Sequence, residues 1–249
     1  ASVESLVGWD ERTLMPEQAG AYRAEQATVL SSLIHKRWTD PQLGEWLAEL
    51  GEADAEDGDR AATVREIRRQ YERKIRLPQQ LVEELARTSI LGQQAWERAR
   101  ADNDFAAFQP VLEKIYRLKR EEADALGYPE APYDALLDDY EPGELTSNVT
   151  RVLGELRDQL VPFVRELLDT GHQVDTSPLH GEYPVAIQDA FGRQASEALG
   201  FDFRRGRLDV TAHPFCTTAG PDDVRITTRF DPTSFPDAFF SILHEAGHG

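Results

Sequence analysis

Near the end of the sequence, His244 and His248 stand four residues apart, and Glu245 directly follows the first of them. Residues at this spacing lie on one face of an α-helix, so both imidazole rings can reach a single cation. Zinc accepts neutral imidazole nitrogens and keeps a position open for water at catalytic sites. The pattern therefore predicts a site for Zn2+, or for another divalent cation such as Co2+, in which Glu245 is the general base for that water.

The same pattern also fits a helix that binds no metal, with two surface histidines and a solvated glutamate between them. Residues 239–243, which precede the motif, are strongly apolar and indicate a buried helix. Unpaired polar groups are costly in such a place and a metal would satisfy all three side chains, so we favour the metal site. Catalytic zinc usually takes three protein ligands, and no third one follows before Gly249.

Two further residues are of types that can take part in catalysis. His213 lies upstream of the motif and fits a metal ligand, a substrate-binding or oxyanion-stabilising group, or a histidine packed in a loop. Cys216 is the only cysteine, and we expect a small buried residue and not a nucleophile. A single cysteine excludes an internal disulfide and favours a reducing compartment, which predicts a cytoplasmic protein.

Helices are expected to make up most of the first 200 residues, because apolar residues recur there every three or four positions. The expected helices cover residues 22–35, 41–50, 61–75, 78–101, 105–126, 145–168 and 185–199. Pro78 suits the first turn of its helix, and Asp104 and Gly127 suit the two ends of the next one. The acidic segment 52–59 and residues 171–184 are expected to be loops.

The pattern changes at about Phe201. Apolar and polar residues alternate over 207–213 and again over 224–230, which predicts two strands. The segment between them, 217–223, contains a Gly-Pro pair and is expected to turn the chain. The two strands would then form an antiparallel hairpin.

One face of this hairpin would be apolar, and the other would present His213, Arg225 and Thr227. After the hairpin, Ser234 can cap a final helix that carries the histidine motif. The predicted fold class is therefore mainly α, a multi-helix array with a small antiparallel β-hairpin before the metal-binding helix.

Composition argues against several classes of function. The chain has 249 residues, with 45 Asp and Glu against 27 Lys and Arg, so its formal net charge is −18. A nucleic-acid-binding surface would need clustered positive charge, and this balance argues against one. The sequence contains no apolar run of about 18 residues, so we expect no segment that spans a membrane.

Three motifs occur in the same order and spacing as in the M32 family of metallocarboxypeptidases. They are His213-Pro214-Phe215, residues 223–227 with the pattern D-x-R-x-T, and the H-E-x-x-H motif at 244–248. Further upstream, residues 8–10, 15–16, 23–26, 119–123 and 133–143 also resemble this family. The resemblance covers essentially the whole chain, and three ordered motifs are far more specific than H-E-x-x-H alone.

The resemblance implies a largely helical, zincin-like peptidase of roughly 500 residues that removes C-terminal residues from peptides as a homodimer. It assigns the metal to His244 and His248 and the general-base role to Glu245. The family's third ligand is a glutamate in a later segment, which is not in this sequence. We therefore expect an N-terminal half that is inactive alone, with residues 1–200 forming the lid and groove wall and residues 201–249 starting the catalytic core.

The resemblance also bears on Arg225 and His213. A carboxypeptidase has to recognise a free carboxylate, which arginine can bind through two parallel hydrogen bonds. On the polar face of its strand, Arg225 is a candidate wall of the substrate groove, together with His213. A salt bridge from Arg225 to Asp222 or Asp223 fits the sequence as well.

A second hypothesis is that the chain is a non-catalytic helical protein that binds peptides, or the partner chain of a split enzyme. It is motivated by the missing third ligand and by the apolar final helix, whose covering half is not in the sequence. Zinc binding without turnover would favour a half-site, and the absence of metal binding would favour a purely structural chain.

Overall fold

The computed structural model describes residues 2–50, 58–179 and 181–249, and the acidic loop expected at 52–59 falls almost entirely outside them. Two compact units are present. Residues 24–170 form one unit, and the residues up to Arg23 form the other together with 171–249. The mainly helical fold class is confirmed. The roles of lid, groove wall and catalytic core stay predictions.

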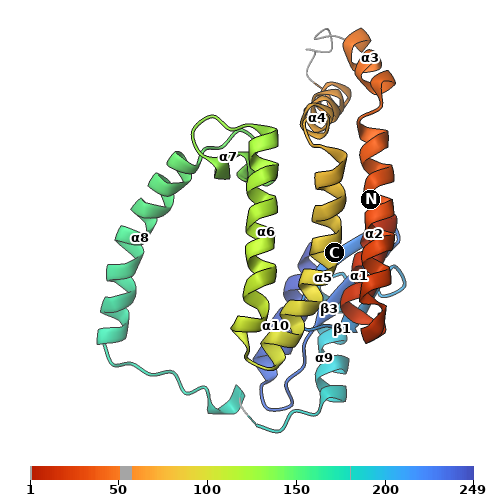
Figure 1. The fold of residues 1–249 in the computed structure, drawn as a ribbon. Helices are drawn as coiled ribbons and strands as arrows, with labels where there is room; N and C mark the ends of the chain where they lie inside the picture. Colours follow the sequence, from red (N-terminus) through yellow and green to blue (C-terminus); the bar gives the residue numbers. More distant parts are fainter. Residues whose placement is uncertain (1, 51–57, 180) are drawn as a thin grey trace. The chain divides into compact units, whose positions relative to one another are not determined.

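The unit of residues 24–170 contains most of the predicted helices, the first of which begins just before it. These helices are α2 (Gly20–Trp38), α3 (Pro41–Leu50), α4 (Asp59–Lys74), α5 (Gln79–Ala101), α6 (Phe105–Leu126), α7 (Pro132–Leu137) and α8 (Thr146–Asp169). Helices α5 and α6 run side by side (Figure 1). Apolar residues at helical spacing on these two helices, such as Leu81 and Leu118, form one core with Ala135 of α7.

The ends of these helices follow local rules. The Asp104 carboxylate accepts a hydrogen bond from the Ala107 N–H, and α6 ends at Gly127, whose φ of 75° is in the left-handed region. Pro78 is expected in the first turn of α5, but its backbone is extended, so it is the residue directly before the helix. Helix α7 is not predicted by the pattern, since its 6 residues are too few to show a period.

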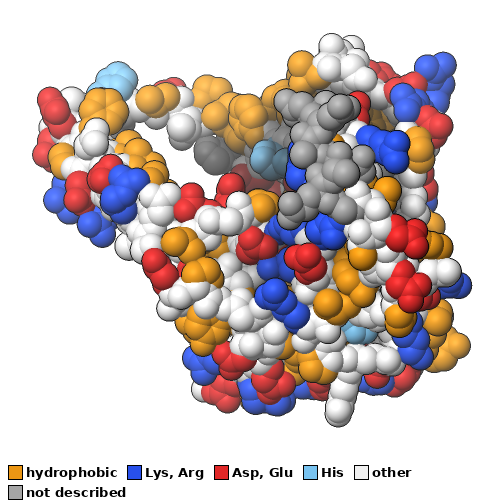
Figure 2. Space-filling model, turned by 90° about the horizontal axis from the view of Figure 1, so that it is seen from above, with side chains coloured by type: hydrophobic (Ala, Val, Ile, Leu, Met, Phe, Trp, Pro, Cys, Tyr) orange, Lys and Arg blue, Asp and Glu red, His pale blue; other side chains and the backbone are white. Residues whose placement is uncertain are grey.

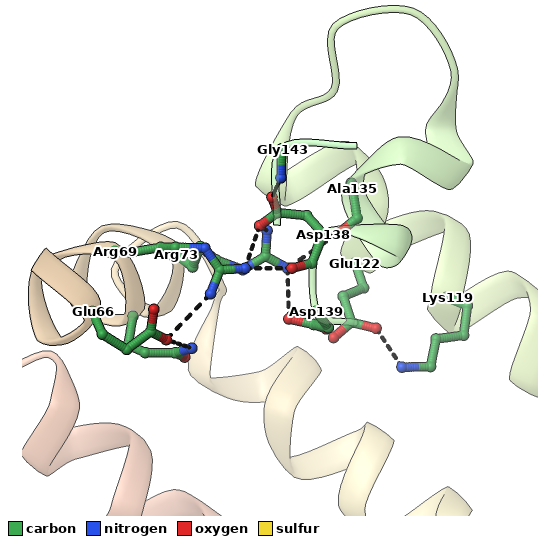
Figure 3. A network of polar contacts seen from close by, with 10 residues as sticks. Glu66, Arg69, Arg73, Lys119, Glu122, Ala135, Asp138, Asp139 and Gly143 are labelled. Atoms are coloured by element: carbon green, nitrogen blue, oxygen red, sulfur yellow. Dashed lines mark hydrogen bonds and ion pairs between the residues drawn. The ribbon is translucent and has the colours of Figure 1, made fainter. Parts of the chain in front are cut away.

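Two arginines of α4 join this helix to the segment that follows α7 (Figure 3). Arg69 and Arg73 each place a guanidinium nitrogen 2.7 Å from Asp138 Oδ2. The other carboxylate oxygen accepts a hydrogen bond from the Gly143 N–H at 2.8 Å. Burial acts to raise the pKa of Asp138, but the bonds from Gly143 and Arg69 outweigh it, so the pKa is lowered.

Asp134 connects the start of α7 with the start of α8. This buried carboxylate accepts hydrogen bonds from the N–H groups of Glu130, Ala131 and Thr146 at 3.1, 2.8 and 2.8 Å, and from the Thr146 hydroxyl. The Thr146 hydroxyl is the largest cause of a lowered pKa, and with the backbone donors it brings the pKa of Asp134 to about 2.

We expect the contribution of Asp134 to stability to disappear in strong acid. Its pKa of about 2 lies below the ordinary value of 3.8, so the unfolded chain binds more protons between these values. The contribution is therefore fully present above about pH 4 and is lost as the pH falls toward about 2. Urea unfolding of the protein and of Asp134→Asn should show a large difference at neutral pH that shrinks in acid. A difference independent of pH would contradict this role.

Charged side chains of both signs are mixed on the surface. Lys and Arg side chains lie next to Asp and Glu side chains over the face shown in Figure 2. Some form pairs, such as Arg87 with both oxygens of Glu25 and Arg151 with Glu155 one helical turn away. Exposed pairs of this kind contribute little to stability. Within the described residues, no helix is long and apolar enough to cross a lipid bilayer.

The other unit contains a sheet and the helix with the histidine motif. Its elements are α1 (Ser2–Thr13), the 3₁₀ turns η1 (Glu17–Ala19) and η2 (Ser177–Leu179), α9 (Val185–Ala198), β1 (Gly206–Val210), β2 (Cys216–Gly220), β3 (Asp223–Thr228) and α10 (Phe235–His248). The strand order is β1-β3-β2, with β3 in the middle. Strand β1 is parallel to β3, and β2 is antiparallel to it.

A hairpin precedes the helix with the histidine motif, as predicted, but the strands of this hairpin differ from the predicted pair. Strand β3 pairs with β2, which lies largely in the segment expected to be the turn. The predicted partner, 207–213, contains β1, and its expected antiparallel pairing with β3 is wrong because the two strands are parallel. Apolar and polar residues alternate in the same way in parallel and in antiparallel strands, so the alternation could not show which of the two pairings forms.

One face of the sheet packs against α10. Leu208 of β1 and Ile226 of β3 form a core with Ile242 of α10. Gly192 of α9 allows Ile242 to approach closely, because a Cβ atom at this glycine would collide with the Ile242 side chain. The sheet and α9 therefore hold α10 between them, which fixes the direction in which its polar residues point.

Candidate metal centre

Helix α10 is oriented by apolar contacts along one side. Ser234 is its N-cap residue as predicted, although its side chain makes no capping hydrogen bond. Phe235 and Phe239 stack with 5.1 Å between their ring centroids, and both contact Phe191 of α9. The apolar run before the motif therefore anchors the helix, and the motif residues take the positions that remain.

The two histidines of the motif turn toward each other. Their Nε2 atoms are 3.2 Å apart, and their ring planes are nearly perpendicular at 85°. Two imidazole nitrogens bound to one tetrahedral zinc ion at about 2.0–2.1 Å would lie about 3.3–3.4 Å apart. His244 and His248 therefore already have the separation that a shared cation requires, and they fit a pair of metal ligands.

Glu245 is buried, whereas both histidines are exposed. The glutamate is 7% exposed, and it shares the buried face of α10 with Ile242. The sequence predicts that the whole motif is buried, and this is wrong for the two histidines. Their side chains lie roughly 100° around the helix axis from the buried face, so they are exposed. The imidazoles are thus accessible to a cation, while the carboxylate lies close to the sheet.

A surface hollow of about 520 Å³ lies beside Glu245 and His248. Its other lining residues are Ser5 of α1 and residues 215–218, at the start of β2. Burial raises the pKa of the Cys216 thiol, and the nearby Glu245 carboxylate raises it further. The raised pKa favours the protonated thiol, and Cys216 is half-buried and not fully buried as expected; its lack of a nucleophilic role stays a prediction.

The two imidazoles are one ligand short of a usual catalytic zinc site. Among residues 2–50, 58–179 and 181–249, no group of three or more His, Cys, Asp or Glu side chains is arranged to hold a metal ion. Catalytic zinc sites commonly use three protein ligands. The donor set found on α10 thus fits a divalent cation in chemistry and spacing, but it supplies only two of these ligands.

His213 is exposed on the connection between β1 and β2, and it does not line the hollow beside α10. Its neighbour Phe215 is bonded to Thr227 of β3. The Phe215 N–H donates to Thr227 Oγ1 at 2.8 Å, and the Phe215 carbonyl accepts from the hydroxyl and the N–H of Thr227 at 2.9 and 3.0 Å. The last residue of H-P-F and the last residue of D-x-R-x-T therefore hold each other in place.

Arg225 lies on the sheet face opposite to α10, because its neighbour Ile226 faces that helix. Its guanidinium donates two hydrogen bonds to Asp223 at 2.8 and 2.9 Å and stacks over the Trp9 ring at 4.2 Å. The structure thus contains the ion pair with Asp223, one of the two alternatives that the sequence leaves open. It does not bring Arg225 together with His244.

Helix α1 also contacts the sheet, which the sequence pattern does not indicate. Trp9 is buried against the guanidinium groups of Arg207 and Arg225. The Thr211 hydroxyl donates to the carbonyl of Arg12, which lies 199 residues away in sequence. Such distant contacts leave no local pattern, and the similarity of residues 8–10 to the M32 family was the only signal.

We expect Thr227→Val to loosen the His213–Phe215 connection. Valine keeps the shape of threonine but removes the hydroxyl that bonds both main-chain groups of Phe215, so exchange of the Phe215 amide hydrogen should accelerate roughly tenfold. Thr228→Val is the matched control, because Thr228 is also fully buried but its hydroxyl donates to Ala238 of α10. Equal acceleration in both variants would contradict the specific role of Thr227.

Comparison with known sequences identifies relatives of the whole chain. The family model described as carboxypeptidase Taq (M32) metallopeptidase matches residues 1–249. Thermostable carboxypeptidase 1 of Thermus thermophilus is 41% identical over 260 residues, which cover 100% of this chain and 51% of that protein. Carboxypeptidase 1 of Bacillus subtilis is 34% identical, over 98% of this chain and 49% of that protein. The chain spans about half the length of the curated relatives it matches.

Solved structures agree with the sequence comparison. The BsuCP crystal structure has a TM-score of 0.94 at 33% identity and covers 99% of this chain and 50% of its own. The crystal structure of the M32 carboxypeptidase from Deinococcus radiodurans has a TM-score of 0.80 at 35% identity, with the same coverage. The resemblance predicted from the three motifs is confirmed: this chain belongs to the carboxypeptidase Taq (M32) family of metallopeptidases.

Proposed function

We propose that this chain contributes the metal-binding helix and the general base of a metallocarboxypeptidase that releases C-terminal amino acids from peptides. The observation that carries the proposal is the arrangement on α10, where two imidazole nitrogens lie 3.2 Å apart and the buried Glu245 is next to the first ligand. The family and the named carboxypeptidases among the relatives support the reaction class.

His244 and His248 would hold the cation, with Zn2+ as the first choice and Co2+ as another ion that suits the same donors. When bound, the cation would lower the pKa of a water molecule and polarise the peptide carbonyl. Glu245 would accept the proton of the attacking water and return it to the leaving amine nitrogen. Burial of Glu245 keeps this carboxylate away from bulk water.

Arg225 and His213 belong to the proposal as substrate-binding residues. Asp223 already binds the Arg225 guanidinium through both carboxylate oxygens, which is the geometry that a C-terminal carboxylate would adopt. For Arg225 to bind substrate, the substrate carboxylate would have to replace Asp223. His213 is exposed and would contact the substrate from the connection before β2.

The remaining parts of the proposal concern the complete protein. A later glutamate would supply the third metal ligand, which is consistent with relatives about twice as long as this chain. We further propose a homodimer located in the cytoplasm. These features follow from the resemblance to the family and from the single cysteine.

The proposed function is tested by assaying the complete natural protein on two peptides that differ only in a free or an amidated C-terminus. We expect cleavage of the free form, release of single C-terminal residues, and loss of cleavage on treatment with a chelator. Recovery on addition of zinc or cobalt would connect the loss to the cation. Equal cleavage of both peptides would indicate an endopeptidase, and cleavage that withstands the chelator would overturn the metal mechanism.

A further inference from the structure

A buried histidine attaches the second half of α2, residues 25–38, to the rest of its unit. His35 is 6% exposed, and among residues 25–38, all of which the structure describes, it is the only buried one. Its ring is hydrogen-bonded to the main chain of Leu77, in the connection between α4 and α5. Helix α2 lies beside α5 (Figure 1), but contacts such as the hydrogen bond from Gln79 to Ser32 are exposed. A segment with so few buried contacts can open locally, so its attachment depends strongly on this ring.

The connection that receives the ring is itself fixed in place. Leu77 is buried in the same core as Leu81 of α5. The Arg76 guanidinium donates a hydrogen bond to the carbonyl of Leu126, at the end of α6, at 2.7 Å. These contacts tie the connection to both α5 and α6. If the contact at His35 is lost, α2 is therefore the element that moves.

The surroundings of the ring suit only its neutral form. Nδ1 of His35 is buried and forms no hydrogen bond with any described residue. A proton on this atom would leave a buried N–H without an acceptor and would bring a positive charge out of water. Two charged side chains act on the ring from neighbouring elements: Lys74 of α4 opposes the added charge, and Glu83 of α5 favours it. With these two opposed, burial is the largest effect on the ring.

The sign of the pH dependence follows from this burial. Burial is the largest cause that lowers the pKa of His35 below its ordinary value of 6.5, and the hydrogen bond to Leu77 offsets it only in part. A ring released into water takes up its proton at a higher pH than the buried ring. Between the two pKa values the released state binds more protons, so acid favours it. The free energy that keeps the ring in place is fully present above about pH 6.5 and is lost as the pH falls below that value.

We propose that His35 is an acid-sensitive switch, in which uptake of a proton by the buried ring releases the second half of α2 from the connection between α4 and α5. The neutral ring fits its buried position, and the charged ring is stabilised only in water, so the two states of α2 follow the two states of the ring. The contacts that carry this inference lie within the unit of residues 24–170. The switch therefore does not depend on the proposed peptidase function.

Amide hydrogen exchange at two pH values tests the switch on the complete natural protein. Protection factors, which remove the intrinsic effect of pH on exchange, are compared at about pH 7.5 and about pH 5.5, where exposed carboxylates stay ionised. We expect protection of residues 32–38 to fall roughly tenfold at the lower pH, the limit for one proton over one unit below 6.5. Protection of α6 should not change. Equal protection of 32–38 at both pH values would overturn the inference.

A variant that cannot take up the proton assigns the effect to this ring. In His35→Gln, the amide can still donate to the main chain of Leu77, but it stays neutral at both pH values, so the protection of 32–38 should become independent of pH. His172→Gln is the matched control, because His172 is an exposed histidine of the other unit, and this variant should keep the full pH response. A response that persists in His35→Gln would contradict the role of His35.

A titration followed by NMR needs no substitution at His35 and tests the same inference if His35→Gln does not fold. The imidazole signals of His35 and the amide signals of 32–38 should change with one common midpoint, below 6.5. Lys74→Met should raise this midpoint, because it removes the charge that opposes protonation, and Glu83→Gln should lower it. A ring that titrates while the amide signals of α2 stay unchanged, or midpoints that shift in the same direction in both variants, would overturn the switch.

Discussion

Glu245→Gln should reduce kcat of the complete natural protein by about two to four orders of magnitude, the usual contribution of a general base. Glutamine keeps the shape of the side chain and can still line the hollow beside His248, but it cannot accept a proton from water. The cation would still be bound, because the two imidazoles are unchanged and remain exposed on the other side of α10. The loss should therefore appear in kcat at full metal occupancy.

Asp237→Asn is the matched control for this variant. Asp237 is an acidic residue in the first turn of the same helix, but it is exposed and does not line the hollow. We expect activity close to that of the unmodified protein, because this change removes one charge without touching the motif. If Glu245→Gln retained activity while Asp237→Asn lost it, the general base would have to be assigned elsewhere.

Helix α10, which carries the histidine motif, could be predicted from the sequence because the pattern that indicates it is local. Two histidines at helical spacing and an apolar run before them are enough to place both imidazoles on one face. The apolar run did not reveal which side of the helix is buried at the motif itself. That depends on Ile242 packing against β3 and Gly192, which belong to other elements. The exposure of both histidines therefore became visible only in the structure.

The sheet shows the opposite case, in which local patterns are insufficient. Alternation correctly indicated β1 and β3, but β2 consists of small residues without alternation and remained unrecognised. Arg225 was expected on the face beside α10, but it lies on the opposite face of β3 with Asp223 and Trp9, because its neighbour Ile226 faces α10. The contact between Trp9 and Arg225 joins residues that are far apart in sequence, so local sequence patterns give no signal for it.

The second large effect is expected for the two proposed metal ligands. His248→Ala should weaken binding of zinc by more than about a hundredfold, because even residues that only orient a ligand change metal affinity by about 10–100-fold. In this variant His244 would lose the partner whose Nε2 lies 3.2 Å from its own, and a single exposed imidazole holds a cation weakly. Activity should fall in parallel and should recover in part at high zinc concentration, a rescue that Glu245→Gln should not show.

Metal content after dialysis and calorimetric titration with zinc would measure this loss, and the absorption spectrum of the cobalt-loaded protein would report the change in ligands. His172→Ala is the matched control, since His172 is an exposed histidine of the same unit but lies outside the motif. The control should bind zinc as tightly as the unmodified protein. If His248→Ala kept its metal and its cobalt spectrum, the cation would have to be bound by other residues. The 3.2 Å approach of the two rings would then be no more than a hydrogen bond between two histidines.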